Sequence, residues 1–250
     1  MRAMTVVAIV RGAKDYNLLL ADATAAAVTE SEAVLRDKIV HVFGNTYATA
    51  IGDGSILACV RAVADWYHPR RPNFRDTQML DLVVALLAKG RRIDQRLGRA
   101  QQPPLGALVF FCTRDDAYYW QINASPDGES FSHLPAPTPI APGEALLFWG
   151  MERVSYSNFA TTPTDPFGPM IGAVRKSDAQ LRRDGGTSIA YPLGDRFSGV
   201  ALPHKSSTDV RRVRPFHDVL EQLVHLLGDE GKEALLSDPE FMSLPMPTVT

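Results

Sequence analysis

Short apolar runs joined by tight turns fill the first fifty residues of the chain. Runs of β-branched and apolar residues separated by Gly, Asn or Asp are typical of antiparallel hairpins, and Gly44-Asn45 is a two-residue turn of this kind. The chain is therefore expected to begin with two hairpins, with an irregular polar excursion over residues 23–37 between them. The expected strand pairs are Thr5–Val10 with Leu18–Asp22, and Lys38–Phe43 with Thr46–Ile51.

Two amphipathic segments follow the hairpins. Ser55–Tyr67 and Asp76–Leu97 repeat apolar residues at the spacing of one helical face, and Pro69 ends the first of them. Strands followed by a pair of helices indicate an α+β arrangement.

The rest of the chain alternates strand and loop signals. Residues 123–144 and 155–169 are rich in turn residues or proline and are expected to be mostly loop. The order of elements fits a four-layer αββα sandwich, in which two sheets pack face to face between helices. The further expected elements are a hairpin of Ala107–Cys112 and Ala117–Ile122, a strand Ala145–Gly150, a short helix Met170–Arg183, a hairpin of Thr187–Leu193 and Phe197–Leu202, and a C-terminal amphipathic helix.

Composition excludes several classes of function. The chain has 250 residues, of which 45% are hydrophobic, and its net charge of −2 gives no basic surplus for nucleic acid. No apolar run approaches the eighteen residues of a membrane span, which favours a cytoplasmic protein. Cys59 and Cys112 lie in apolar surroundings and are expected to be core thiols. The histidines lack ligand spacing and there is no phosphate loop, so no metal and no cofactor is expected.

One set of residues near the N-terminus has a distinctive spacing. Asp22 and Lys38 are sixteen residues apart, Gly52 follows Lys38 by fourteen, and Thr5 opens the first strand. This pattern resembles the N-terminal half of proteasome-type β subunits, the bacterial proteasome-like and HslV-like peptidases of the N-terminal nucleophile (Ntn) hydrolase superfamily. The resemblance covers residues 5–67 most clearly.

The resemblance implies a role for each of these residues. The Thr5 hydroxyl would be the nucleophile and its free α-amine the general base. The Lys38 ammonium would favour the neutral form of that amine, and Asp22 would hold Lys38 in place. The backbone N–H of Gly52 would stabilise the oxyanion. Asp184 is the candidate supporting residue of a late loop.

The sequence departs from the family at two supporting serines. One position falls in Trp149-Gly150-Met151 and the other in Gly185-Gly186-Thr187, and neither has a serine. In addition, Met1–Met4 precede Thr5, so a free amine requires translation from Met4 or removal of a short propeptide. Two alternatives therefore stay open beside a threonine protease: a catalytically inactive adaptor subunit of a proteasome-like assembly, and an Ntn amidase acting on small amides.

The expected organisation follows the resemblance. Residues 1–203 would form the proteasome-like domain, and residues 204–250 a C-terminal helical extension packed on it. The family implies a homo-oligomeric ring acting on peptide or unfolded-protein substrates, with a separate ATPase unfoldase as partner. Neither nucleic acid nor a membrane is expected as a partner.

Overall fold

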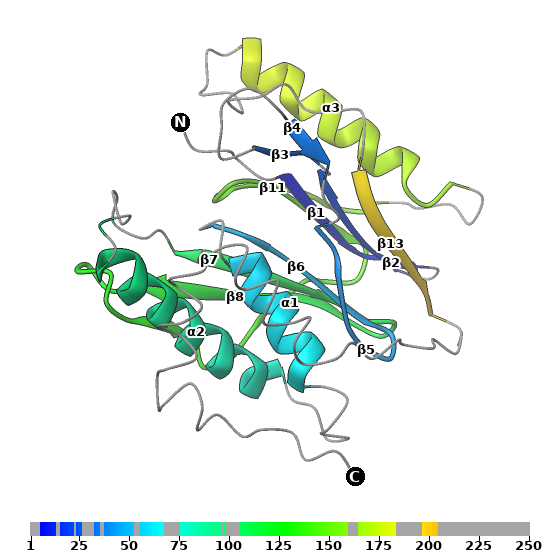
Figure 1. Ribbon diagram of the computed structural model, residues 1–250. Coiled ribbons are helices and arrows are strands. Elements are labelled where there is room, and N and C mark those ends of the chain that lie inside the picture. The colour runs from blue at the N-terminus through cyan, green and yellow to red at the C-terminus, as the bar shows by residue number, and fades with distance from the viewer. Residues whose placement is uncertain are drawn as a thin grey trace.

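The computed structural model contains two large antiparallel sheets, a two-stranded antiparallel sheet and three helices among its described residues (Figure 1). The structure describes residues 6–13, 16–22, 24–26, 33–35, 38–52, 56–67, 76–96, 98, 106–159, 165–183 and 197–204. The predicted C-terminal helical extension, the predicted strand over residues 187–193, Thr5 and Asp184 lie outside these ranges.

The first sheet has five strands in the order β12-β11-β1-β2-β13. All neighbours are antiparallel, and the predicted first hairpin is confirmed by the pairing of β1 with β2. The strands are β1 (Val6–Arg11), β2 (Tyr16–Asp22), β11 (Glu144–Trp149), β12 (Glu152–Tyr156) and β13 (Phe197–Pro203).

The second sheet has six strands in the order β10-β8-β7-β6-β5, with β9 also paired to β8. The predicted hairpins over Gly44-Asn45 and between β7 and β8 are both confirmed. The strands are β5 (Val40–Phe43), β6 (Thr46–Ile51), β7 (Ala107–Cys112), β8 (Ala117–Ala124), β9 (Phe131–His133) and β10 (Thr138–Pro139).

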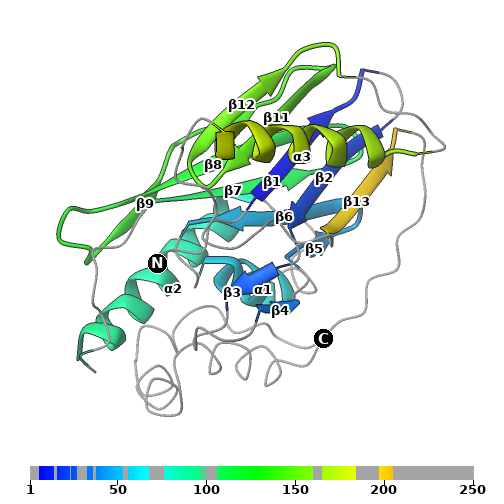
Figure 2. The ribbon, with the colours of Figure 1, turned by 90° about the horizontal axis from the view of Figure 1, so that it is seen from above.

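Three helices cover the outer faces of the sheets. Helices α1 (Ile56–Tyr67) and α2 (Asp76–Arg96) pack on the second sheet, and α3 (Gly168–Arg183) packs on the first. Figure 2, seen from above, shows α3 lying across the strands of the first sheet. The two helices predicted from apolar periodicity, Ser55–Tyr67 and Asp76–Leu97, are therefore present, as is the predicted short helix over Met170–Arg183.

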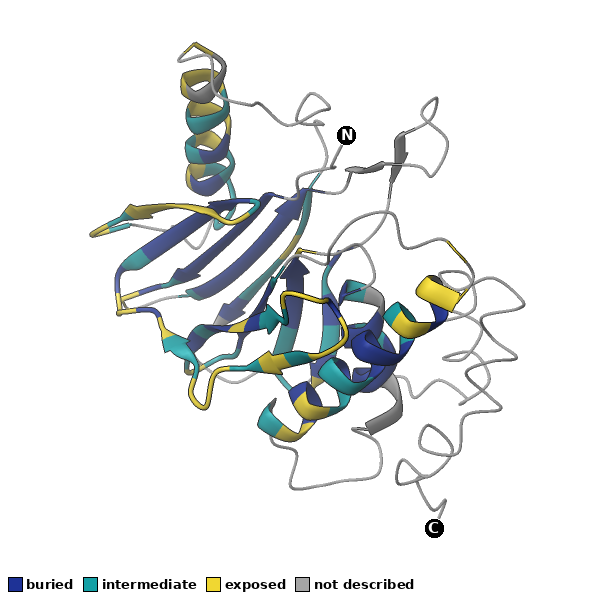
Figure 3. Cartoon of the chain, turned by 90° about the vertical axis from the view of Figure 1, so that its left-hand side faces the viewer, coloured by how far each residue is buried: buried dark blue, intermediate teal, exposed yellow. Residues whose placement is uncertain are grey.

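The apolar core has three parts. One cluster lies between α1, α2 and the second sheet, one between the two sheets, and one between the first sheet and α3. Strand β1 contributes Val7 and Ile9 to the cluster between the sheets and Val6, Ala8 and Val10 to the cluster under α3. The run is continuously apolar because both faces of the strand are buried (Figure 3).

Some sequence predictions were wrong. The excursion over residues 23–37 contains a short antiparallel pair, β3 (Thr24–Ala26) and β4 (Ala33–Leu35). Residues 123–144 are mostly loop, as predicted, but they also contain β9 and β10, and residues 155–156 belong to β12. Strand β13 pairs with β2, a partner the sequence analysis did not identify, while its predicted partner lies outside the described residues.

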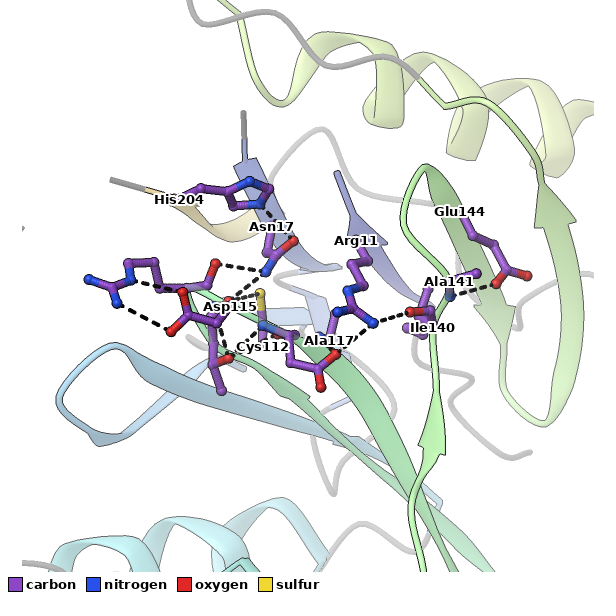
Figure 4. A network of polar contacts seen from close by, with 12 residues as sticks. Arg11, Asn17, Cys112, Asp115, Ala117, Ile140, Ala141, Glu144 and His204 are labelled. Atoms are coloured by element: carbon purple, nitrogen blue, oxygen red, sulfur yellow. Dashed lines mark hydrogen bonds and ion pairs between the residues drawn. The ribbon is translucent and has the colours of Figure 1, made fainter. Parts of the chain in front are cut away.

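A polar network ties the two sheets together at the end where Arg11 and Asn17 lie (Figure 4). Asn17 is 1% exposed, and its amide nitrogen donates to the carbonyls of Thr113 and Arg114 at 2.9 and 3.0 Å. Its amide oxygen accepts a hydrogen bond from Nε2 of His204 at 3.1 Å. One buried side chain therefore connects β2, the turn between β7 and β8, and the residue after β13.

The two cysteines are buried and free, as the sequence predicted. Burial raises the pKa of the Cys112 thiol far above its usual range, so the thiol stays protonated. Cys112 is therefore a core residue rather than a reactive one.

Replacing Asn17 with alanine is expected to lower the free energy of unfolding by about 2–3 kcal/mol, because it removes the hydrogen bonds of a buried amide to two part-buried carbonyls and to His204. Urea denaturation would measure the change. Asn123 is a suitable control, since its hydrogen bond with Gln121 is exposed. If Asn17→Ala is as stable as Asn123→Ala, the hydrogen bonds of Asn17 do not hold the two sheets together.

Candidate functional site

Asp22 and Lys38 form a buried ion pair that joins the two sheets. Lys38 Nζ lies 2.9 Å from Asp22 Oδ2, and the two side chains are 8% and 7% exposed. The other oxygen, Asp22 Oδ1, accepts the backbone N–H of Val6 at 2.8 Å. Both carboxylate oxygens thus have a donor, which matches the requirement that buried charges be paired and hydrogen-bonded.

The strands bring this pair together from both sheets. Asp22 is the last residue of β2, and Lys38 comes two residues before β5. Because β1 and β2 are antiparallel, the end of β2 lies beside the start of β1, where Val6 is located. The structure therefore brings together Asp22 and Lys38, two of the residues selected by spacing, and their catalytic roles stay predictions.

Gly52 directly follows β6 and has a backbone conformation that other residues rarely adopt, with φ of 138°. A Cβ atom built there would lie 2.7 Å from Ala107 Cβ and 2.8 Å from Gly106 O. Since Val40 pairs with Ala48, the antiparallel register places Gly52 at the same end of the sheet as Lys38. The glycine is required by this close approach of two backbones, and its role toward an oxyanion stays a prediction.

The turn between β11 and β12 lies at this same end. Trp149 pairs with Val6, and Gly150 follows with φ of 59°. Met151, at 49% exposed, stands next in the chain where the resembled family has its first supporting serine. This turn therefore places a thioether, rather than a hydroxyl, near the start of β1.

Thr5 and Asp184, the other two residues selected from the sequence, lie outside the described residues. Ala50, which lies on β6 two residues before Gly52, is 4% exposed and packs in the cluster between the second sheet and its helices.

Thr49 was not among the site residues predicted from the sequence. Its hydroxyl is 0% exposed and donates to the backbone carbonyl of Lys38 at 2.7 Å. The only available signal was a polar residue one position before Ala50 in an otherwise apolar strand end. Because threonine is itself common in strands, that signal has little weight.

No three or more His, Cys, Asp or Glu side chains within the described ranges gather into a group able to hold a metal ion. Of the helices in those same ranges, none has the length and apolar character needed to cross a bilayer.

Comparisons with known proteins give structural similarities only. No family model and no curated protein matches the sequence. The chain is similar to the eukaryotic HslV from Trypanosoma brucei, with 16% identity and a TM-score of 0.42 over 80% of this chain and 99% of that chain. It is also similar to the Thiobacillus denitrificans protein BPH, with 10% identity and a TM-score of 0.36 over 81% of this chain and 100% of that chain.

The complex of that Thiobacillus denitrificans protein with Epoxomicin gives 10% identity and a TM-score of 0.35, over 80% of this chain and 100% of that chain. HslV-like and bacterial proteasome-like proteins are also the ones that the N-terminal spacing resembles. At TM-scores below 0.5, these similarities assign no role to any residue.

Proposed function

We propose that this chain is a proteasome-like threonine peptidase subunit of the Ntn-hydrolase type, with the four-layer αββα sandwich of that fold. The observation that carries the proposal is the buried pair of Lys38 and Asp22, whose carboxylate also accepts the Val6 N–H. That nitrogen belongs to the peptide bond between Thr5 and Val6. Residue 5, which carries the hydroxyl, is therefore bonded directly to the nitrogen that Asp22 holds beside the Lys38 ammonium.

The chemistry proposed is acyl transfer in two steps. The Thr5 α-amine takes the hydroxyl proton while Oγ forms a bond to the substrate carbonyl carbon. The C–N bond then breaks and the departing amine receives that proton. Water next adds to the ester, with the same amine as base, and releases the peptide acid and the Thr5 hydroxyl.

The other site residues support this reaction. Lys38 provides a positive charge close to the amine and the developing oxyanion, and Asp22 keeps that charge in place. Gly52 donates its backbone N–H to the oxyanion, and Asp184 is the supporting residue. Glycine at 52 is also what lets the chain pass close to Ala107 at this point.

Replacing Thr5 with alanine is expected to lower the rate of peptide hydrolysis by about 10³-fold or more, because the nucleophile is removed. Mass spectrometry of the purified chain would first establish whether residue 5 carries the free amine. Thr46→Ala, on β6 and remote from the ion pair, is the control and should retain activity. Hydrolysis that survives Thr5→Ala would overturn the proposal.

A second candidate is an inactive adaptor subunit of a similar assembly. The specific observation in its favour is Met151, exposed in the β11–β12 turn at the position of an expected serine. A threonine-directed electrophile separates the two functions. An adduct on Thr5 supports the peptidase, whereas a stable oligomer with no adduct supports the adaptor. Hydrolysis of small amides but not of peptides would instead indicate an Ntn amidase.

The proposed assembly and location follow from the same proposal. The chain would form a homo-oligomeric ring in the cytoplasm and take peptide or unfolded-protein substrates, with a separate ATPase unfoldase as partner. Residues 1–203 would form the catalytic domain, and residues 204–250 would pack on it as a helical extension.

A further inference from the structure

Thr49 is a polar residue at a position where an apolar one would be expected. Its neighbours Ala48 and Ala50 face the helices, so strand alternation directs Thr49 toward the other sheet. Its partner in the register is Phe110, a member of the apolar cluster between the sheets. Valine has almost the same shape and would not bury a hydroxyl there. Burying this hydroxyl costs free energy unless it is hydrogen-bonded, so its hydrogen bond is the reason to ask what Thr49 does.

The hydrogen bond of Thr49 acts on the backbone of Lys38. The Thr49 hydroxyl lies 2.7 Å from the Lys38 carbonyl, whereas the ladder of β5 begins only at Val40. The Thr49 side chain thus adds a hydrogen bond to the backbone of the residue that carries the ammonium, just before the β5 ladder begins. Fixing this carbonyl fixes the point from which the Lys38 side chain reaches across to Asp22.

We propose that Thr49 is a positioning residue that holds the backbone of Lys38, and so directs its ammonium toward Asp22 and the reacting groups. This inference rests on the proposed function insofar as it concerns catalysis. The placement of Lys38 can be measured separately. Ammonium groups held in a buried ion pair react slowly with acylating reagents, so the exposure of Lys38 to such a reagent reports its position.

The test compares Thr49→Val, which removes only the hydroxyl, with Thr49→Ser, which keeps it. In Thr49→Val we expect acetylation of Lys38, read by peptide mass spectrometry, to rise about 5-fold or more, and kcat to fall about 10-fold with little change in KM. In Thr49→Ser both should stay within about 2-fold of wild type. Lys89, which is also 7% exposed but lies on α2, is the internal control.

Val42→Ala is the matched structural control. It removes buried apolar volume from β5 without touching the hydrogen bond, and it should reduce stability while leaving Lys38 acetylation unchanged. The proposal is overturned if Lys38 in Thr49→Val is acetylated at the wild-type rate. It is also overturned if acetylation of Lys89 rises as much as that of Lys38, or if Thr49→Ser gives the same acetylation and kcat as Thr49→Val. A rise of Lys38 acetylation in Val42→Ala would equally overturn it.

The two proposals fail in distinguishable ways. If the wild-type chain hydrolyses no peptide, the proposed function is wrong, and selective acetylation of Lys38 in Thr49→Val still supports the positioning role. If the wild type is active and Thr49→Val changes neither Lys38 acetylation nor kcat, the positioning role is wrong and the proposed function stands.

Discussion

Replacing Lys38 with methionine is expected to lower the free energy of unfolding by about 3–5 kcal/mol, because it leaves the Asp22 carboxylate buried without its counter-ion. Both side chains are under a tenth exposed, so water does little to screen the charge that remains. Adding Asp22→Asn should recover a large part of the loss, since the neutral amide can still accept the Val6 N–H. Peptide hydrolysis should be lost in both variants.

Urea denaturation of the single and double variants would measure these changes, and the double-mutant cycle gives the coupling between the two residues. Lys176→Met is the matched control, because Lys176 is exposed on α3 and its replacement should change stability by about 0.5 kcal/mol or less. Additive losses from the two single variants would show that the ion pair does not couple the sheets.

The Gly52→Ala variant is expected to lose about 2–5 kcal/mol of unfolding free energy. Two costs contribute. The backbone at φ of 138° disfavours any side chain, and the new Cβ would lie 2.8 Å from the Cα of Ala107, an atom that cannot move alone. The close contact should also separate β6 from β7 next to the ion pair, so hydrolysis should fall as well.

Two other glycines separate these costs. Gly44 has φ of 47° with nothing within 4 Å, so Gly44→Ala tests backbone conformation alone and should cost about 1 kcal/mol. Gly172 lies inside α3 with open space around it, and Gly172→Ala should stabilise the chain by about 0.5–1 kcal/mol. Thermal or urea unfolding of all three variants would measure these changes and so separate the cost of the backbone conformation from the cost of the contact with Ala107. If Gly52→Ala loses no more unfolding free energy than Gly44→Ala, the backbone at Gly52 does not pass close to Ala107.

Hairpins and helices that are specified by residues close together in the chain were predicted from the sequence. The hairpin over Gly44-Asn45 and helices α1 and α2 follow from turn residues and apolar periodicity, and the structure contains them. Strand β12 was missed because it is a sheet edge. Its residues Glu152–Ser155 are exposed, and it therefore lacks the alternation that identifies a half-buried strand.

Long-range pairing could not be derived in this way. The pairing of β13 with β2 joins residues about 180 positions apart, and no nearby residue indicates it. For the candidate site, the spacing of Asp22 and Lys38 identified two side chains that do meet, whereas Thr49 escaped notice because threonine suits strands in general. The roles of Thr5, Gly52 and Asp184 remain predictions.

The strand order also bears on how the chain folds during its synthesis. The second sheet and its two helices use residues 40–139, a nearly continuous stretch, whereas β1 and β2 need partners from residues 144–149 and 197–203. Synthesis runs from the N-terminus, so these partners are made only after the whole of the second sheet. Strands β1 and β2 are almost wholly buried in the folded chain, and they therefore cannot complete their own sheet until most of the chain has been made.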